Sequence, residues 1–123
     1  MSIKYNSDKK LLEHLSIVLQ ETLESGKVDV KTLAETMSIS TCQLNRRVKH
    51  ATGLTAYDYV LATRLQKAKQ MLGMFPEVTI LETARNCGFA DTAHFSHVFR
   101  RKEGMSPTQY IHRLKALKTK KNE

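Results

Sequence analysis

Apolar residues recur at helical spacing along most of the chain, whereas the strict alternation that marks a β-strand is scarce. The first apolar stripe lies between Ser7 and Asp8, which can start a helix, and Gly26, which can end it. Its members stand mostly three or four residues apart: Leu11, Leu12, Leu15, Val18, Leu19 and Leu23. The pattern predicts an amphipathic helix over this stretch.

Start and stop signals divide the rest of the chain into further helices. Caps or capping boxes are expected at Asp29, Ser40 with Gln43, Thr55 to Asp58, Thr79 to Glu82, Asp91, and Ser106 to Gln109. Helix stops are expected at Gly53, Gly88 and Gly104, and chain breaks at Gly73 and Pro76. Pro107 suits the first position of the last helix, where its missing N–H costs nothing. We therefore predict an all-α fold of about seven helices.

The chain also repeats itself after a shift of 51 residues. The shift places Ser40 on Asp91, Leu44 on Phe95, Val48 on Phe99, Lys49 on Arg100, Gly53 on Gly104, Thr55 on Ser106 and Tyr59 on Tyr110. Caps, apolar positions, a basic residue and terminating glycines thus coincide in order. The turn before the second cap is one residue longer, because Ala34 lies six residues before Ser40 and Ala84 seven before Asp91.

This repeat indicates two helix-turn-helix subdomains joined by a long linker helix. Within a single domain of residues 1–123, we expect the first unit with its lead-in helix at 8–54. The linker helix is expected at 55–73 and the second unit at 79–117.

The formal net charge of +8 is unevenly distributed. Residues 1–39 carry five Lys and six Asp/Glu, and residues 40–123 carry fifteen Lys/Arg and six Asp/Glu. The positive charge therefore belongs to the part of the chain that contains both repeated units, which suits a polyanionic partner. On charge alone, a merely soluble basic surface is an equal alternative.

The second helix of a helix-turn-helix unit lies in the major groove, so its outer face should be polar or small. The faces away from Leu44 and Val48 carry Thr41, Cys42, Gln43, Asn45, Arg46 and Lys49. Those away from Phe95 and Phe99 carry Thr92, Ala93, His94, Ser96, His97 and Arg100. Arg can bind guanine through two bonds, Asn or Gln can bind adenine, and small side chains can touch a thymine methyl. Phosphate contacts are expected from Ser40, Thr41, Lys49, Thr79, Arg100 and Arg101.

Over residues 8–113 the chain resembles the AraC/XylS family of bacterial transcription regulators. The most specific stretch is the second unit, through Ala84, Gly88, Phe89, Asp91, Phe95, Phe99, Arg100, Gly104, Ser106, Pro107 and Tyr110. The first unit matches more loosely, through Leu33, Ala34, Ser40, Leu44, Arg46, Lys49, Gly53, Tyr59, Arg64 and Ala68. Three positions depart from the family pattern: Val48 replaces Phe, Ala56 replaces Pro, and Thr83 puts a hydroxyl toward the core.

The resemblance implies base contacts by Cys42, Gln43, Asn45 and Arg46 in the first unit and by Thr92, Ala93, His94, Ser96 and His97 in the second. It also implies asymmetric binding of one chain across two adjacent grooves of double-stranded DNA, and recruitment of RNA polymerase. Family members usually join this module to a sensing region. We therefore expect the output domain of a larger sensor-regulator or response regulator, monomeric by itself, with a small stand-alone regulator as the alternative.

Catalytic motifs are missing from the sequence: it has no Gly-rich phosphate loop, G-x-S-x-G or H-E-x-x-H. We expect no enzyme activity, no cofactor and no metal, since His94 and His97 have no third ligand near them in sequence. Cys42 and Cys87 are expected to be free thiols in a reducing cytoplasm, and no apolar run is long enough to span a membrane.

Two other functions are weaker alternatives. A helical module for an acidic protein or RNA would expose Leu, Met or aromatic side chains in a groove. A nonspecific architectural DNA binder would need apolar wedges.

Overall fold

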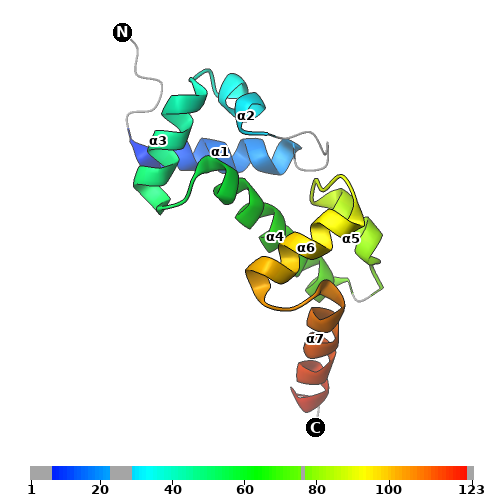
Figure 1. Ribbon diagram of the computed structural model, residues 1–123. Coiled ribbons are helices and arrows are strands. Elements are labelled where there is room, and N and C mark those ends of the chain that lie inside the picture. The colour runs from blue at the N-terminus through cyan, green and yellow to red at the C-terminus, as the bar shows by residue number, and fades with distance from the viewer. Residues whose placement is uncertain (1–6, 23–28, 76, 122–123) are drawn as a thin grey trace. The chain divides into compact units, whose positions relative to one another are not determined.

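The computed structural model describes residues 7–22, 29–75 and 77–121, without the side chains of 118–121. Its helices are α1 (Asp8–Thr22), α2 (Val30–Thr36), α3 (Thr41–Thr52), α4 (Ala56–Met74), α5 (Ile80–Asn86), α6 (Thr92–Glu103) and α7 (Pro107–Lys121) (Figure 1). The described part of the chain contains these seven helices and no strand, which confirms the all-α prediction. No described helix is both long and apolar enough to cross a lipid bilayer.

The chain divides into two compact units, Met1–Arg64 and Leu65–Glu123. The boundary falls inside α4, so the first part of this helix belongs to unit 1 and the second part to unit 2.

In unit 1, α1, α2 and α3 pack against one another around an apolar core. The α1 stripe is buried at Leu11, Leu15, Val18 and Leu19, and Leu12 is half-buried. The two other predicted features of this stretch, Leu23 and Gly26, lie outside the described residues. The core is completed from the other helices by Leu33, Ala34, Met37, Leu44, Val48, Ala56 and Val60. Helical spacing thus predicted which side of α1 is buried.

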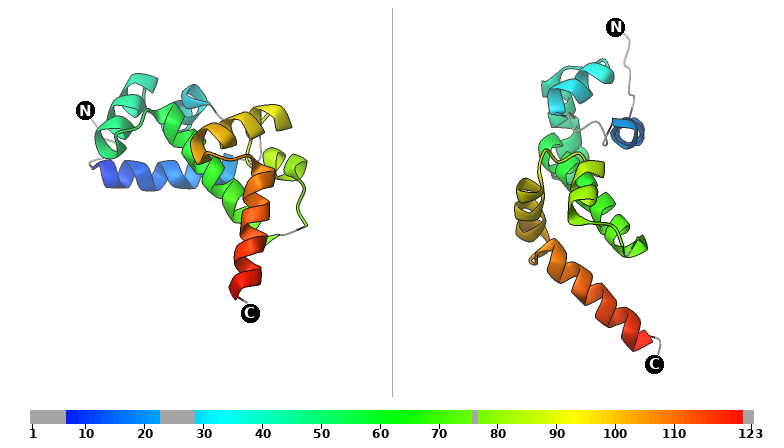
Figure 2. Two further views of the ribbon diagram at one scale, coloured as in Figure 1. Left: turned by 60° about the horizontal axis from the view of Figure 1, so that its bottom comes forward. Right: turned by 90° about the vertical axis from the view of Figure 1, so that its right-hand side faces the viewer.

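In unit 2, α6 packs against α5 and α7. Aromatic rings form a chain through its core, with centroid distances of 5.2 Å for Phe89–Phe95, 5.7 Å for Phe95–Phe99 and 5.5 Å for Phe99–Tyr110. All of these pairs have the tilted or edge-on geometry that aromatic rings prefer. Figures 1 and 2 show α7 extending away from α6, with its C-terminal half beyond the rest of the unit.

The hydroxyl of Thr83, which departs from the family pattern, is satisfied within its own helix. Thr83 is 0% exposed, and its Oγ1 donates to the backbone oxygen of Thr79 at 2.9 Å. Cys87 is also fully buried and lies 4.0 Å from the sulfur of Met71. It packs as a small apolar side chain.

The turn between α2 and α3 in unit 1 has the same backbone conformation as the turn between α5 and α6 in unit 2. The backbone enters the left-handed region at Ser38 (φ 60°) in unit 1 and at Gly88 (φ 86°) in unit 2. The next amide then donates back to an alanine, from Ile39 to Ala34 and from Phe89 to Ala84, each at 3.0 Å. The additional residue of unit 2 therefore follows this turn, before the helix cap.

Most of the predicted helix ends agree with those in the structure. Gly53 and Gly104 both have φ 80° and donate to the carbonyl four residues earlier, as C-terminal glycines do. The break predicted at Gly73 is wrong: α4 continues to Met74, and the amide of Phe75 still donates to Met71 at 2.9 Å. The break predicted at Pro76 lies outside the described residues.

Candidate nucleic-acid interface

Helix α3 presents a polar outer face because its inner face is anchored. A capping box begins the helix: Ser40 Oγ accepts from the Gln43 amide at 3.0 Å, and Gln43 Oε1 accepts from the Ser40 amide at 3.5 Å. Leu44 and Val48, both 0% exposed, fix the inner face. Directly opposite, three exposed residues follow at i, i+4 and i+7: Cys42, Arg46 and Lys49.

Helix α6 repeats this arrangement in unit 2. Asp91 caps it by accepting from the His94 amide at 2.6 Å, and Phe95 and Phe99 are 0% exposed. The exposed residues opposite are Ala93, His97 and Arg100, which occupy the positions of Cys42, Arg46 and Lys49 after the 51-residue shift. We call these two sets the outer faces of α3 and α6.

The remaining predicted base-reading residues lie beside these outer faces. Thr92 and Ser96 are half-buried, and His94 is exposed with its ring edge-on to Phe89 at 5.6 Å. Gln43 is exposed, although its side chain also takes part in the capping box. Asn45 is half-buried, and its Oδ1 accepts a hydrogen bond from the Ala56 amide at 3.1 Å. The structure therefore does not bring Asn45 into the outer face of α3.

Cationic side chains gather in the last turns of the same two helices. Lys49 occupies the last turn of α3, and Arg100, Arg101 and Lys102 that of α6. All four are exposed. Their charge also lies favourably near the negative end of each helix dipole.

The hydroxyl residues predicted to touch phosphates lie at helix N-termini. Ser40 caps α3, and Thr79 caps α5 by accepting from the Glu82 amide at 3.0 Å. Thr41, the first residue of α3, is exposed. A hydroxyl that accepts one bond keeps its own proton to donate, and first-turn N–H groups favour anions.

Sequence reasoning missed one polar cluster that supports α3. Asp8 was expected only to help start the first helix, a role that Ser7 performs by accepting from the Lys10 amide at 3.2 Å. Asp8 instead pairs with the end of α3, through Oδ1 to Arg47 Nε at 3.2 Å and Oδ2 to His50 Nδ1 at 2.8 Å. The hydrogen bond from His50, and then that from Arg47, lower the pKa of Asp8 below its usual value. Arg47 and His50 lie 39 and 42 residues after Asp8 in the sequence, so no local pattern could reveal these contacts.

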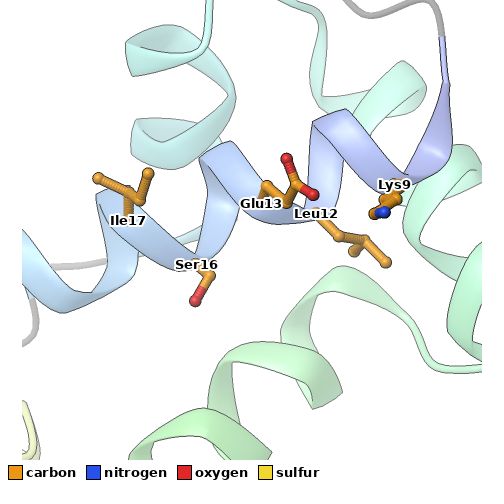
Figure 3. Close-up of a pocket in the computed structure, with 5 residues that line it drawn as sticks. All are labelled: Lys9, Leu12, Glu13, Ser16 and Ile17. Carbon is orange, nitrogen blue, oxygen red and sulfur yellow. The ribbon is translucent and has the colours of Figure 1, made fainter.

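A surface hollow lies along α1, lined by Lys9, Leu12, Glu13, Ser16 and Ile17 (Figure 3). All five side chains come from this one helix, and none of them is a predicted DNA contact. In the part of the chain that the structure describes, no three His, Cys, Asp or Glu side chains gather as metal ligands would.

Several curated proteins are similar to this chain. The HTH-type transcriptional activator RhaS of Escherichia coli is 40% identical over 83 residues, covering 68% of this chain. The probable transcriptional regulator LumQ of Photobacterium leiognathi is 34% identical over 108 residues, covering 84% of it. The matches span only 30% of RhaS and 43% of LumQ.

Solved structures share the fold. The DNA-binding domain of the global transcriptional factor AdpA, crystallised with a target DNA, matches with a TM-score of 0.76 and 28% identity. The match covers 85% of this chain and 93% of that one. The C-terminal domain of the response regulator yesN of Fusobacterium nucleatum matches with a TM-score of 0.75 and 25% identity, covering 83% of this chain and 98% of that one.

Two helix-turn-helix units with polar, basic outer faces define a DNA-binding module of a transcription regulator. The family model described as a helix-turn-helix domain matches residues 33–113, a stretch that runs from within α2 into α7 and contains both α3 and α6. The chain belongs to the AraC/XylS family of transcription regulators.

Proposed function

We propose that the outer faces of α3 and α6 read two adjacent major-groove segments of one DNA duplex. The observation that carries this proposal is the repetition of one design on both helices. In each, two fully buried side chains hold the inner face, and small or hydrogen-bonding side chains face outward. A basic residue follows in the last turn. This is the distribution that groove reading requires.

Base reading is assigned first to the residues at the centre of the outer faces. Arg46 can donate two hydrogen bonds to guanine O6 and N7, the most frequent specific contact in the major groove. His97 takes the equivalent position on α6 and can donate or accept one bond. Cys42 and Ala93 are small enough to contact a thymine methyl. Beside them, the exposed or half-buried side chains of Gln43, Thr92, His94 and Ser96 extend the reading surface.

Phosphate binding is assigned to Lys49, Arg100 and Arg101, with hydroxyl and N-terminal amide contacts at Ser40, Thr41 and Thr79. These contacts set the position of each unit on the duplex and contribute affinity for every sequence alike. They also make binding dependent on salt, because each neutralised phosphate releases condensed counterions.

For the whole protein, we infer an output domain within a larger sensor-regulator or response regulator that recruits RNA polymerase. The matched segments of RhaS and LumQ amount to less than half of each protein, and yesN is a two-component response regulator. We further propose that the module by itself is monomeric and non-catalytic.

The first test is selection from random duplex DNA at roughly 150 mM salt, near physiological ionic strength. Two short enriched boxes about one helical turn apart are expected. Arg46→Ala should then remove discrimination at one base pair of one box, and His97→Ala at one base pair of the other. Binding that follows only salt concentration, without any enriched sequence, would refute sequence-specific reading.

A further inference from the structure

Asn45 is the predicted base-reading residue whose side-chain oxygen already has a partner outside its own helix. It lies on the flank of α3, half-buried, and its Oδ1 accepts from the backbone amide of Ala56 at 3.1 Å. Ala56 is the first residue of α4 and is 1% exposed. First-turn amides have no acceptor within their own helix, and a buried N–H left unpaired is costly. Asn45 therefore supplies the hydrogen-bond acceptor that the Ala56 amide lacks within its own helix.

Unit 2 contains the same two positions with a different solution. The 51-residue shift places Asn45 on Ser96 and Ala56 on Pro107. Pro107 is the buried first residue of α7, as Ala56 is of α4. Proline has no N–H, so the second unit has no amide to satisfy at this point. The carboxamide of Asn45 thus occurs in unit 1, where the Ala56 amide is buried. The shorter hydroxyl of Ser96 occurs in unit 2, where Pro107 has no amide N–H.

We propose that Asn45 is a positioning residue that fixes the turn from α3 into α4 through the Ala56 amide, and that it does not read adenine. Adenine recognition by Asn requires the oxygen and the nitrogen of the carboxamide together, to accept from N6 and donate to N7. The bond to Ala56 directs the oxygen toward α4, so the carboxamide cannot present its oxygen and its nitrogen together to one adenine edge. Its nitrogen can still donate to an acceptor such as phosphate or guanine. Only this statement about DNA rests on the proposed function.

A double-mutant cycle tests the positioning role without DNA. Asn45→Ala should lower the Tm of the wild-type chain, whereas in an Ala56→Pro background it should leave the Tm unchanged or slightly higher. The difference between the two effects should be about 4–10 °C, as expected for one buried amide that loses its acceptor. An equal loss in both backgrounds would overturn the proposal, because Asn45 would then act through something other than the Ala56 amide.

A second pair of variants covers the case in which Ala56→Pro does not fold. Asn45→Asp keeps an acceptor oxygen at the same place, beside the positive end of α4, whereas Asn45→Leu keeps the size and removes the oxygen. We expect Asn45→Asp to retain the wild-type Tm within about 2 °C and Asn45→Leu to lose several degrees, as for any unpaired buried amide. Similar losses in both variants contradict the hydrogen-bonding role.

The DNA measurement compares Asn45→Ala with Arg46→Ala on the selected operator, well below both melting temperatures. Arg46→Ala should lose about 5- to 150-fold discrimination at one base pair. Asn45→Ala should keep discrimination at every base pair within about twofold, the precision expected of such a comparison. A loss above fivefold at one adenine would show that Asn45 reads DNA. If selection yields no operator, the proposed function fails, while the thermal cycle still decides the role of Asn45.

Discussion

Replacing Gly73 by alanine tests the helical backbone at the end of α4. Gly73 lies in the last turn of the helix, where the sequence suggested a break. An added Cβ would meet only Leu114 Cδ1, at 3.9 Å, which is an ordinary van der Waals contact. Gly73, unlike Gly53, Gly88 and Gly104, does not have a positive φ, so an L residue can adopt its backbone conformation. Gly73→Ala should therefore stabilise the chain by about 0.4–1 kcal/mol, because alanine has less backbone freedom to lose on folding.

For a chain of 123 residues, about 1 kcal/mol corresponds to roughly 4 °C in Tm. We therefore expect Gly73→Ala to raise the midpoint of thermal unfolding, followed by far-UV circular dichroism, by about 2–4 °C.

Gly104→Ala is the matched control. Nothing lies within 4 Å of its added Cβ, so space is available, but its φ of 80° is costly for alanine. The left-handed conformation costs about 1–2 kcal/mol in an L residue, so the Tm should fall by roughly 4–8 °C. If Gly73→Ala lowered the Tm as Gly104→Ala does, the helical conformation assigned to Gly73 would be wrong.

Three further variants test other features. Ser38→Gly should raise the Tm by roughly 2–4 °C, because the φ of 60° at Ser38 is strained for serine; a lower Tm would contradict this. Asp8→Asn should lower the Tm at neutral pH. Because the folded-state pKa of Asp8 lies below its usual 3.8, the carboxylate stabilises above that pH. The difference from wild type should shrink as the pH falls through 3.8 and below, and a difference independent of pH would exclude the ion pairs as its cause. Lys49→Ala should weaken binding to all sequences alike and reduce the slope of log affinity against log salt by about 0.9; a change at one base pair alone would identify Lys49 as a base-reading residue.

The helix order and most helix ends could be predicted because their signals are local. The Ser40 capping box joins residues three apart, and the left-handed cap at Gly53 depends on the glycine itself. Gly73 misled the prediction because a glycine lowers helix stability without forbidding the helix. Here the hydrogen bond from Phe75 to Met71 continues the helical pattern past it.

The candidate site could be predicted only in part, because exposure and side-chain direction depend on tertiary contacts. Helical spacing indicated that Arg46 and His97 face outward, and both are exposed. The same spacing could not show that Asn45 bonds to a residue 11 positions later, or that Asp8 reaches His50 42 positions later. Both contacts form only when a second helix packs against α3.

The proposed reading of two DNA boxes predicts that one chain binds DNA in a single orientation. The backbone design is shared, but the paired outer-face residues differ: Arg46 corresponds to His97, and Cys42 to Ala93. A guanidinium with a fixed pair of donors and an imidazole with one bond to offer prefer different base edges. Two unlike boxes are therefore expected in the operator, and exchanging their order should weaken binding even though every base pair is retained. Because this asymmetry lies within one chain, the proposed function predicts that the covalent order of the two units sets the direction of the chain on the DNA.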